Sequence, residues 1–137
     1  MSTVAQRRAA DALARVNELS ARPDDEFKRR YRAYVDRLGP AILMNGLGQA
    51  LATERASAGE NPTRIDQRAH HELYLSLHRW LCSDDTVYPG SPDLLQAIMA
   101  NDESSYVRAQ AEALAWLSWH KKFCHAALPR GEDGGSQ

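Results

Sequence analysis

Residues 70–78, HHELYLSLH, place histidine and glutamate together on one predicted helix, the composition of a zinc-protease motif. That motif is HExxH, because two histidines one helical turn apart converge on a single metal ion. His71 and Glu72 begin it, but Leu75 stands where the second histidine is required. His71 and His78 share a helix face, yet at roughly 1.5 Å of rise per residue they lie about 10 Å apart. We therefore expect solvent-facing histidines and neither a metal site nor a cofactor.

A second reactive pair is His120 and Cys124, which lie one helical turn apart and could together form a thiolate nucleophile. Nothing else in the sequence supplies an acid to orient the histidine or a donor for an oxyanion. We interpret His120 as a core histidine with a satisfied hydrogen bond. We interpret Cys124 and Cys82 as buried, reduced thiols. Without a candidate catalytic residue, the sequence predicts neither an enzyme nor a small-molecule substrate.

Basic side chains between residues 24 and 38 could contact the phosphate groups of a nucleic acid. They flank an aromatic stripe on both sides, and only Glu26 and Asp36 offset them within the predicted helix. The basic residues are Lys28, Arg29, Arg30, Arg32 and Arg37. A solvated, self-paired face explains this pattern as well as a phosphate-binding face does. Both interpretations stay open.

Two further sets of basic residues are candidates for the same role. Arg8 and Arg15 lie seven residues apart on the first predicted helix, where Asp11 and Glu18 could pair with them. The short connection to the second helix suggests that the two helices pack side by side, which would join their basic residues. On the outer face of the last helix, the candidates are Lys121 and Lys122.

Small and aromatic residues mark candidate contact surfaces. The segment 45–52, NGLGQALA, is expected inside a helix, although glycine there costs about 1 kcal/mol relative to alanine. Gly46 and Gly48 therefore predict a close approach of another backbone, from within the fold or from a partner subunit. Trp116 is expected in the core, whereas Trp119 is expected half exposed, where tryptophan favours interfaces. The candidate subunit-interface residues are Asn45, Gly46, Gln49 and Trp119.

The elements that position these residues are predicted to be helices. Alanine and leucine number 36, whereas valine, isoleucine and threonine together number 12, and β-branched side chains disfavour helices. Apolar stripes and capping residues predict an all-α fold, a single-domain bundle of about six helices with a long C-terminal helix. The expected helices cover about 3–20, 24–38, 40–58, 63–82, 92–100 and 102–128. Residues 1–128 form the predicted domain, and 129–137 a disordered tail.

The charge of the chain is nearly balanced, at −1 over 137 residues, unlike that of a generic nucleic-acid binder. Residues 1–38 carry nine basic and six acidic side chains, whereas residues 39–137 carry eight and twelve. One face is therefore expected to be basic and another acidic. The sequence shows no signal peptide and no apolar run long enough for a membrane span, so we expect a cytoplasmic protein.

Three segments together resemble one known family. They are residues 34–41, with a tyrosine-bearing helix end followed by Gly39-Pro40-Ala41; residues 45–52, NGLGQALA; and residues 102–123, DESSYVRAQAEALAWLSWHKKF. In order and spacing they are similar to the small helical subunit of the type III-B CRISPR (Cmr) RNA-targeting complex. The resemblance covers most of residues 24–127. His120 departs from the pattern, since an apolar residue is expected there.

The resemblance implies a non-catalytic helical bundle. Members of the family stack in several copies to form a filament beside the backbone subunits that hold the CRISPR RNA, and help line the channel for the target RNA. The implied partners are the backbone and large Cmr subunits, further copies of the chain, and the CRISPR RNA with its target. The alternative is a stand-alone helical regulator that binds a nucleic acid or a partner protein.

Overall fold

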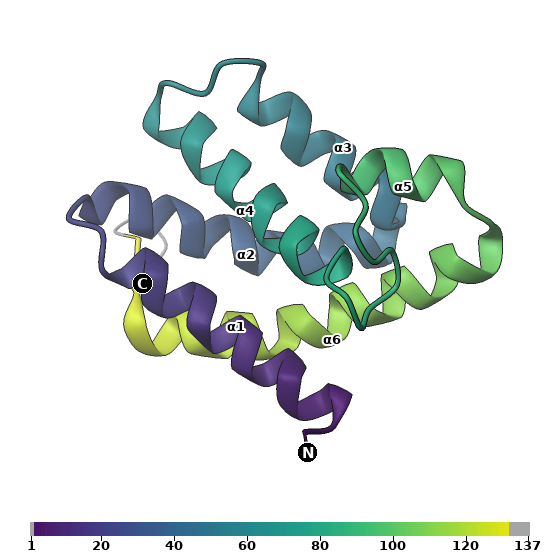
Figure 1. The fold of residues 1–137 in the computed structure, drawn as a ribbon. Helices are drawn as coiled ribbons and strands as arrows, with labels where there is room; N and C mark the ends of the chain where they lie inside the picture. Colours follow the sequence, from purple (N-terminus) through teal and green to yellow (C-terminus); the bar gives the residue numbers. More distant parts are fainter. Residues whose placement is uncertain (1, 132–137) are drawn as a thin grey trace.

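The computed structural model describes residues 2–131, which form six α-helices and contain no strand (Figure 1). In chain order these are α1 (Val4–Ser20), α2 (Asp25–Asn45), α3 (Leu47–Ala58), α4 (Ile65–Leu81), α5 (Leu94–Ala100) and α6 (Glu103–Ala127). The predicted all-α, single-domain bundle with a long C-terminal helix is confirmed. Of the predicted tail, residues 129–131 are described, without regular secondary structure, and the remainder lies outside the described residues.

Most helix starts are fixed by side chains that accept hydrogen bonds from the first free backbone N–H groups. Thr3, Asp24 and Asp102 cap α1, α2 and α6, as their sequence positions predict. The start of α5 lies two residues after the predicted start at residue 92, because Asp93 is the capping residue. Its carboxylate accepts from the backbone N–H of Gln96, so Pro92 remains outside the helix.

The second helix packs against α3, α4 and α6, whereas α1 packs chiefly along α6 (Figure 1). The expectation that α1 lies beside α2 is therefore wrong. Polar contacts explain the choice of partner: the Trp116 indole of α6 donates to Asp11 of α1 at 2.9 Å. Ala12 and Val16, on the same side of α1, are completely buried. The basic residues of α1 are consequently not joined to those of α2 in the expected way.

The second helix continues through Pro40 to Asn45, instead of ending near Leu38 as predicted. Proline inside a helix costs about 3 kcal/mol, because it removes one hydrogen bond and crowds the preceding turn. The apolar stripe nevertheless continues beyond it, because Ile42, one turn after Leu38, is completely buried. Burying a side chain of this size contributes about 1.5–3 kcal/mol, which offsets much of the cost of the proline.

Gly46 forms the break between α2 and α3, so it is not in mid-helix as expected. Its φ of 88° and ψ of 157° lie in a region that side chains with a Cβ rarely adopt. The approaching group is a side chain, not a backbone: an added Cβ would lie 3.0 Å from the Tyr106 hydroxyl. That hydroxyl accepts from the N–H of Gly48, and Gln110 accepts from the N–H of Leu47, so α6 caps α3.

Candidate nucleic-acid interface

The basic residues in the first turns of α2 are partly neutralised by neighbouring carboxylates. Arg29 and Arg30 both pair with Glu26, at 3.5 Å and 2.8 Å. Lys28 pairs with Asp25 at 3.2 Å and donates to a backbone carbonyl of α1, and its side chain is only 12% exposed. Lys28 therefore holds the α1–α2 connection, whereas Arg29 and Arg30 share one negative charge between two guanidinium groups.

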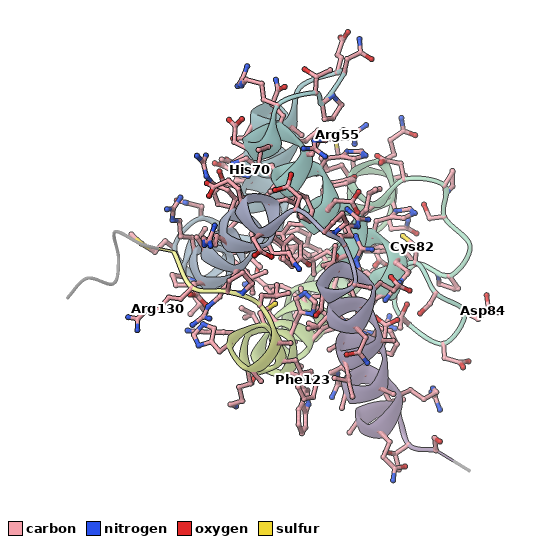
Figure 2. All side chains as sticks on the ribbon, turned by 90° about the vertical axis from the view of Figure 1, so that its left-hand side faces the viewer. Arg55, His70, Cys82, Asp84, Phe123 and Arg130 are labelled. Carbon is pink, nitrogen blue, oxygen red and sulfur yellow. The ribbon has the colours of Figure 1, made fainter. Side chains whose placement is uncertain are left out.

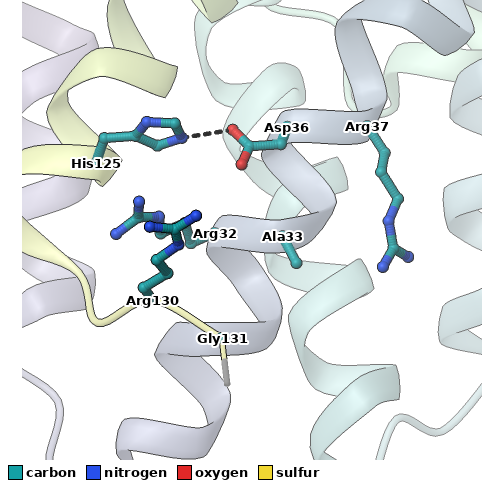
Figure 3. Close-up of a pocket in the computed structure, with 7 residues that line it drawn as sticks. All are labelled: Arg32, Ala33, Asp36, Arg37, His125, Arg130 and Gly131. Carbon is teal, nitrogen blue, oxygen red and sulfur yellow. Dashed lines mark hydrogen bonds and ion pairs between the residues drawn. The ribbon is translucent and has the colours of Figure 1, made fainter. Parts of the chain in front are cut away.

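Farther along α2, Arg32 and Arg37 meet Arg130 around a pocket of about 440 Å³. Figure 3 shows Arg32 and Arg130 on one side of Ala33, and Arg37 on the other. Arg130 comes from the segment after α6, which the Arg32 guanidinium holds by donating to the Leu128 carbonyl at 2.9 Å. This segment brings to the site a basic residue that the sequence prediction missed, because residues 129–137 were expected to be disordered.

The carboxylate nearest to this pocket is already engaged. Asp36 accepts a hydrogen bond from Nε2 of His125 at 2.7 Å, at the rim of the same pocket (Figure 3). Arg32, Arg37 and Arg130 form no ion pair with a carboxylate of residues 2–131. Three guanidinium groups therefore line one pocket with a single carboxylate, Asp36, which is hydrogen-bonded to His125.

A second pocket, of about 570 Å³, adjoins the first. It is lined by Arg29, Arg30 and Arg37, together with Glu26 and Tyr34. Ala33, Arg37 and Gly131 line both pockets, which makes Arg37 the arginine common to them.

A stack of side chains holds Arg37 in place. Its guanidinium lies over the Tyr34 ring, 5.4 Å from the centroid, and the same ring stacks on His70 with the centroids 3.8 Å apart. Nδ1 of His70 in turn lies 2.7 Å from the carboxylate of Glu54. Burial raises the pKa of Glu54, and the hydrogen bond from His70 acts in the opposite direction. The surface arginine thus rests on a column that reaches from α2 through α4 to α3.

Arg15 is not available to a nucleic acid in this fold. It is 8% exposed and donates to Ser76 at 2.7 Å and to the Glu72 carboxylate at 2.5 Å. Burial alone would raise the pKa of Glu72, but the hydrogen bond and charge of Arg15 lower it overall. The seven-residue spacing on α1 therefore reflects packing against α4 for Arg15, which we remove from the candidates.

Arg8 is engaged with α6 rather than with its neighbour Asp11. Its guanidinium makes two hydrogen bonds to Glu112, at 2.5 Å and 2.9 Å, and the Trp80 indole donates to the same carboxylate at 2.7 Å. Such a bidentate, partly buried pair fixes α1 on α6. Asp11 instead lies 3.4 Å from Arg79. Arg8 is therefore a structural residue in this fold.

The remaining basic candidates, Lys121 and Lys122, are exposed on the last turns of α6. Neither forms an ion pair with any of residues 2–131. Figure 2 shows Asp84 and Arg130 projecting from opposite sides of the molecule.

The candidate catalytic and metal-binding groups lie apart from this surface. His120 is fully buried between the Tyr31 hydroxyl and the Ala12 carbonyl, as predicted. Cys82 and Cys124 are free and buried, and burial raises the pKa of Cys124 to about 12. His71 and His78 are half-buried, so they do not face solvent as fully as expected. Residues 2–131 contain no cluster of three metal-ligating side chains.

An uncharged surface covers the α2–α3 junction. No charged side chain occurs from Leu38 to Thr53, yet Leu43 and Met44 are 71% and 83% exposed. The neighbouring candidates Asn45 and Gln49 are exposed as well. Sequence reasoning did not single out Leu43 and Met44, because the apolar run 41–44 does not by itself show which of its side chains are exposed.

Trp119 is 43% exposed on α6 and stacks on Phe123, with the ring centroids 5.8 Å apart. Its partner ring comes from the same helix, so half of the indole remains free for a contact.

Among residues 2–131, none of the helices combines the length and the hydrophobicity that a membrane span needs.

A sequence model of the family described as "CRISPR-associated protein (Cas_Cmr5)" matches residues 4–127, which include all six helices. Among solved structures, the X-ray crystal structure of a CRISPR-associated Cmr5 family protein from Thermus thermophilus is similar, with a TM-score of 0.71 and 27% sequence identity. That match covers 94% of this chain and 100% of the other. The chain therefore belongs to the CRISPR-associated Cmr5 family, the small helical subunits of the Cmr complexes that its sequence resembles.

Proposed function

We propose that the chain is a non-catalytic subunit that stacks in copies beside the Cmr backbone subunits and lines the channel for the target RNA. One observation carries the RNA contact: Arg32, Arg37 and Arg130 line one pocket, and none of them forms an ion pair with a carboxylate of the described residues. Arginine side chains in such a position bind phosphate groups and carry no sequence information. This suits a subunit that must accept any target sequence.

The near-neutral charge of the chain argues for RNA binding within an assembly rather than by one copy. A few arginine contacts give weak binding that salt readily suppresses. When several copies present the same surface along one strand, the contacts act together and the overall affinity rises steeply. A stacked row of subunits therefore needs only a small basic surface on each copy.

The uncharged junction between α2 and α3 supports a role in assembly. Exposed Leu43 and Met44, with Asn45 and Gln49 beside them, offer a surface without charges to desolvate. Trp119 provides a second, separate contact point on α6. We assign these residues to contacts with neighbouring subunits, whether copies of the chain or backbone subunits. The chain holds them on packed helices, as a scaffold requires.

The test is reconstitution of the complex, with its guide RNA, in the presence and absence of this subunit. The complete complex is expected to bind target RNA more tightly and with a steeper dependence on salt. Cleavage of the RNA that is bound is expected to proceed at the same rate in both preparations. Unchanged affinity and salt dependence without the subunit would refute the proposed role in the channel. Loss of cleavage at saturating target RNA would refute the non-catalytic assignment.

A further inference from the structure

The two arginine pockets beside α2 form one continuous surface. Ala33 and Gly131, both small, lie between them, and Arg37 lines both. Arg130 closes the first pocket from the segment after α6, and Arg29 and Arg30 border the second. The pockets are therefore neighbouring halves of a track that passes across α2 and is walled by arginine on each side.

The charges of the track favour a bound anion in each half. The first pocket holds three guanidinium groups, and its one carboxylate, Asp36, is engaged by His125. The second has Glu26 shared between Arg29 and Arg30. Because like charges at close range repel each other, anions bound in both halves would stabilise the arrangement. Consecutive phosphates of a polynucleotide present two linked anions side by side.

The track offers no aromatic face on which a base could stack. Tyr34 is the only aromatic ring lining it other than the imidazole of His125, and Tyr34 is 7% exposed. Arg37 lies over the Tyr34 ring, and His70 stacks on the same ring. His125 is held at the rim by its hydrogen bond to Asp36. Proteins that grip single strands by their bases depend on free aromatic platforms, which this surface lacks.

We infer that the track binds the sugar–phosphate backbone of a single RNA strand at two consecutive phosphates, with Arg37 between them and the bases turned away. This inference rests on the proposed function and assigns its RNA contact to particular atoms. Arg130 contacts one phosphate together with Arg32, and Arg29 and Arg30 contact the next. A strand held in this way keeps its bases free to pair with a complementary guide.

The inference is tested on the full-length chain by titration with short oligouridylate and oligoadenylate at several salt concentrations. Arg130→Gln should weaken binding by about two- to five-fold, as expected for a surface charge contact. It should also flatten the slope of log affinity against log salt by about 0.7, the value for one phosphate of a single strand. Arg37→Gln should weaken binding and flatten the salt slope more than Arg130→Gln does, because Arg37 lines both halves of the track. The two oligonucleotides should bind equally.

Arg108→Gln provides the matched control. It removes the same charge from an exposed arginine of α6 that lies about 26 Å along the helix axis from His125. Its binding and salt slope should equal those of the unmodified chain. Ala33→Leu fills the track without changing the charge of the chain, and it should weaken RNA binding. Circular dichroism establishes that each variant is folded.

Three outcomes would overturn the inference. One is equal RNA binding by Arg37→Gln, Arg130→Gln and the Arg108 control. Another is a strong preference for one oligonucleotide, which would require base contacts. The third is unchanged RNA binding by the variants together with failure to enter the complex, because the track would then hold an acidic protein surface. The proposed function fails separately, if the complex without the subunit binds target RNA as tightly as the complete one.

Discussion

Tyr31 donates a hydrogen bond from its hydroxyl to Nε2 of His120 at 2.7 Å and so joins α2 to α6 inside the core. The direction follows from the other side of the imidazole ring. Nδ1 lies 3.1 Å from the Ala12 carbonyl, which can only accept, so Nδ1 carries the proton and Nε2 accepts. Ser76 lies 2.9 Å from the Tyr31 hydroxyl and accepts from Arg15. One chain of polar contacts therefore links α1, α2, α4 and α6.

Replacing Tyr31 with phenylalanine should destabilise the fold by about 1–3 kcal/mol, because buried Nε2 of His120 loses its donor. Tyr88 provides the matched control, since its hydroxyl is also buried but has no partner among the described residues. Tyr88→Phe should therefore cost little or even stabilise the protein. Urea unfolding of both variants measures the difference. An equal loss of unfolding free energy in the two variants would show that the Tyr31–His120 hydrogen bond does not contribute to stability.

The stability of the protein should decrease on acidification below about pH 6.5. Burial lowers the pKa of His120 from 6.5 to about 3 in the folded protein. The unfolded chain therefore binds more protons between these values, and stability present above the unfolded pKa is lost as the pH falls. The loss from this one group is about 1.4 kcal/mol per pH unit. Urea unfolding at a series of pH values above about 5 measures the contribution of His120 separately from that of the carboxylates, because carboxylates ordinarily titrate at lower pH.

His120→Gln identifies the group responsible for this pH dependence. The variant should be less stable at neutral pH, but its stability should change less between about pH 7 and pH 5, because no buried imidazole has to be protonated. Gly39→Ala, which changes no titratable group, should leave the slope as in the unmodified chain. If the His120 variant keeps the full slope, the pH dependence arises from another group.

Apolar stripes and capping residues predicted the helices well, because both signals are local. The exceptions arise from contacts distant in sequence. Proline at position 40 is a favoured helix start, yet α2 continues because Ile42 has a place in the core. Gly46 ends α2, and the hydroxyl of Tyr106, sixty residues later in the sequence, caps the start of α3.

The candidate interface was less predictable than the fold, for the same physical reason. Arg15 and Arg32 are the same residue type on amphipathic helices, and only tertiary packing distinguishes them. Arg15 is buried against Glu72, whereas Arg32 reaches the pocket that Arg130 completes. His120, in contrast, was interpreted correctly, because its place between apolar neighbours on one helix face already indicated burial.

Gly46→Ala should destabilise the protein by about 1–3 kcal/mol, the usual cost of forcing a side chain into this backbone region. The new Cβ would also lie 3.0 Å from the Tyr106 hydroxyl, which would have to move away from the N–H of Gly48. Gly39→Ala is the control: this glycine lies inside α2 with nothing within 4 Å of its Cβ position. There alanine should stabilise by about 0.5–1 kcal/mol. Thermal unfolding that ranks the two variants the other way would contradict the assigned roles.

Met44→Lys should leave the isolated protein intact but prevent its incorporation into the complex. The side chain is 83% exposed, so the stability of the isolated chain should change by less than about 0.5 kcal/mol. In an assembly that covers the α2–α3 junction, the lysine would be buried without a partner, at a cost of several kcal/mol. Native mass spectrometry of reconstituted complexes measures the number of copies bound.

Two comparisons make this last prediction specific to the junction. Leu13→Lys introduces the same charge at another exposed leucine, 42% exposed on α1, and should assemble like the unmodified chain. Met44→Glu should fail as Met44→Lys does, because desolvation penalises either sign of charge. If only one of the two charges at Met44 prevents assembly, the junction meets a charged surface of the same sign. If both assemble normally, the junction remains exposed to water in the complex, and Trp119 becomes the principal candidate for the subunit contact.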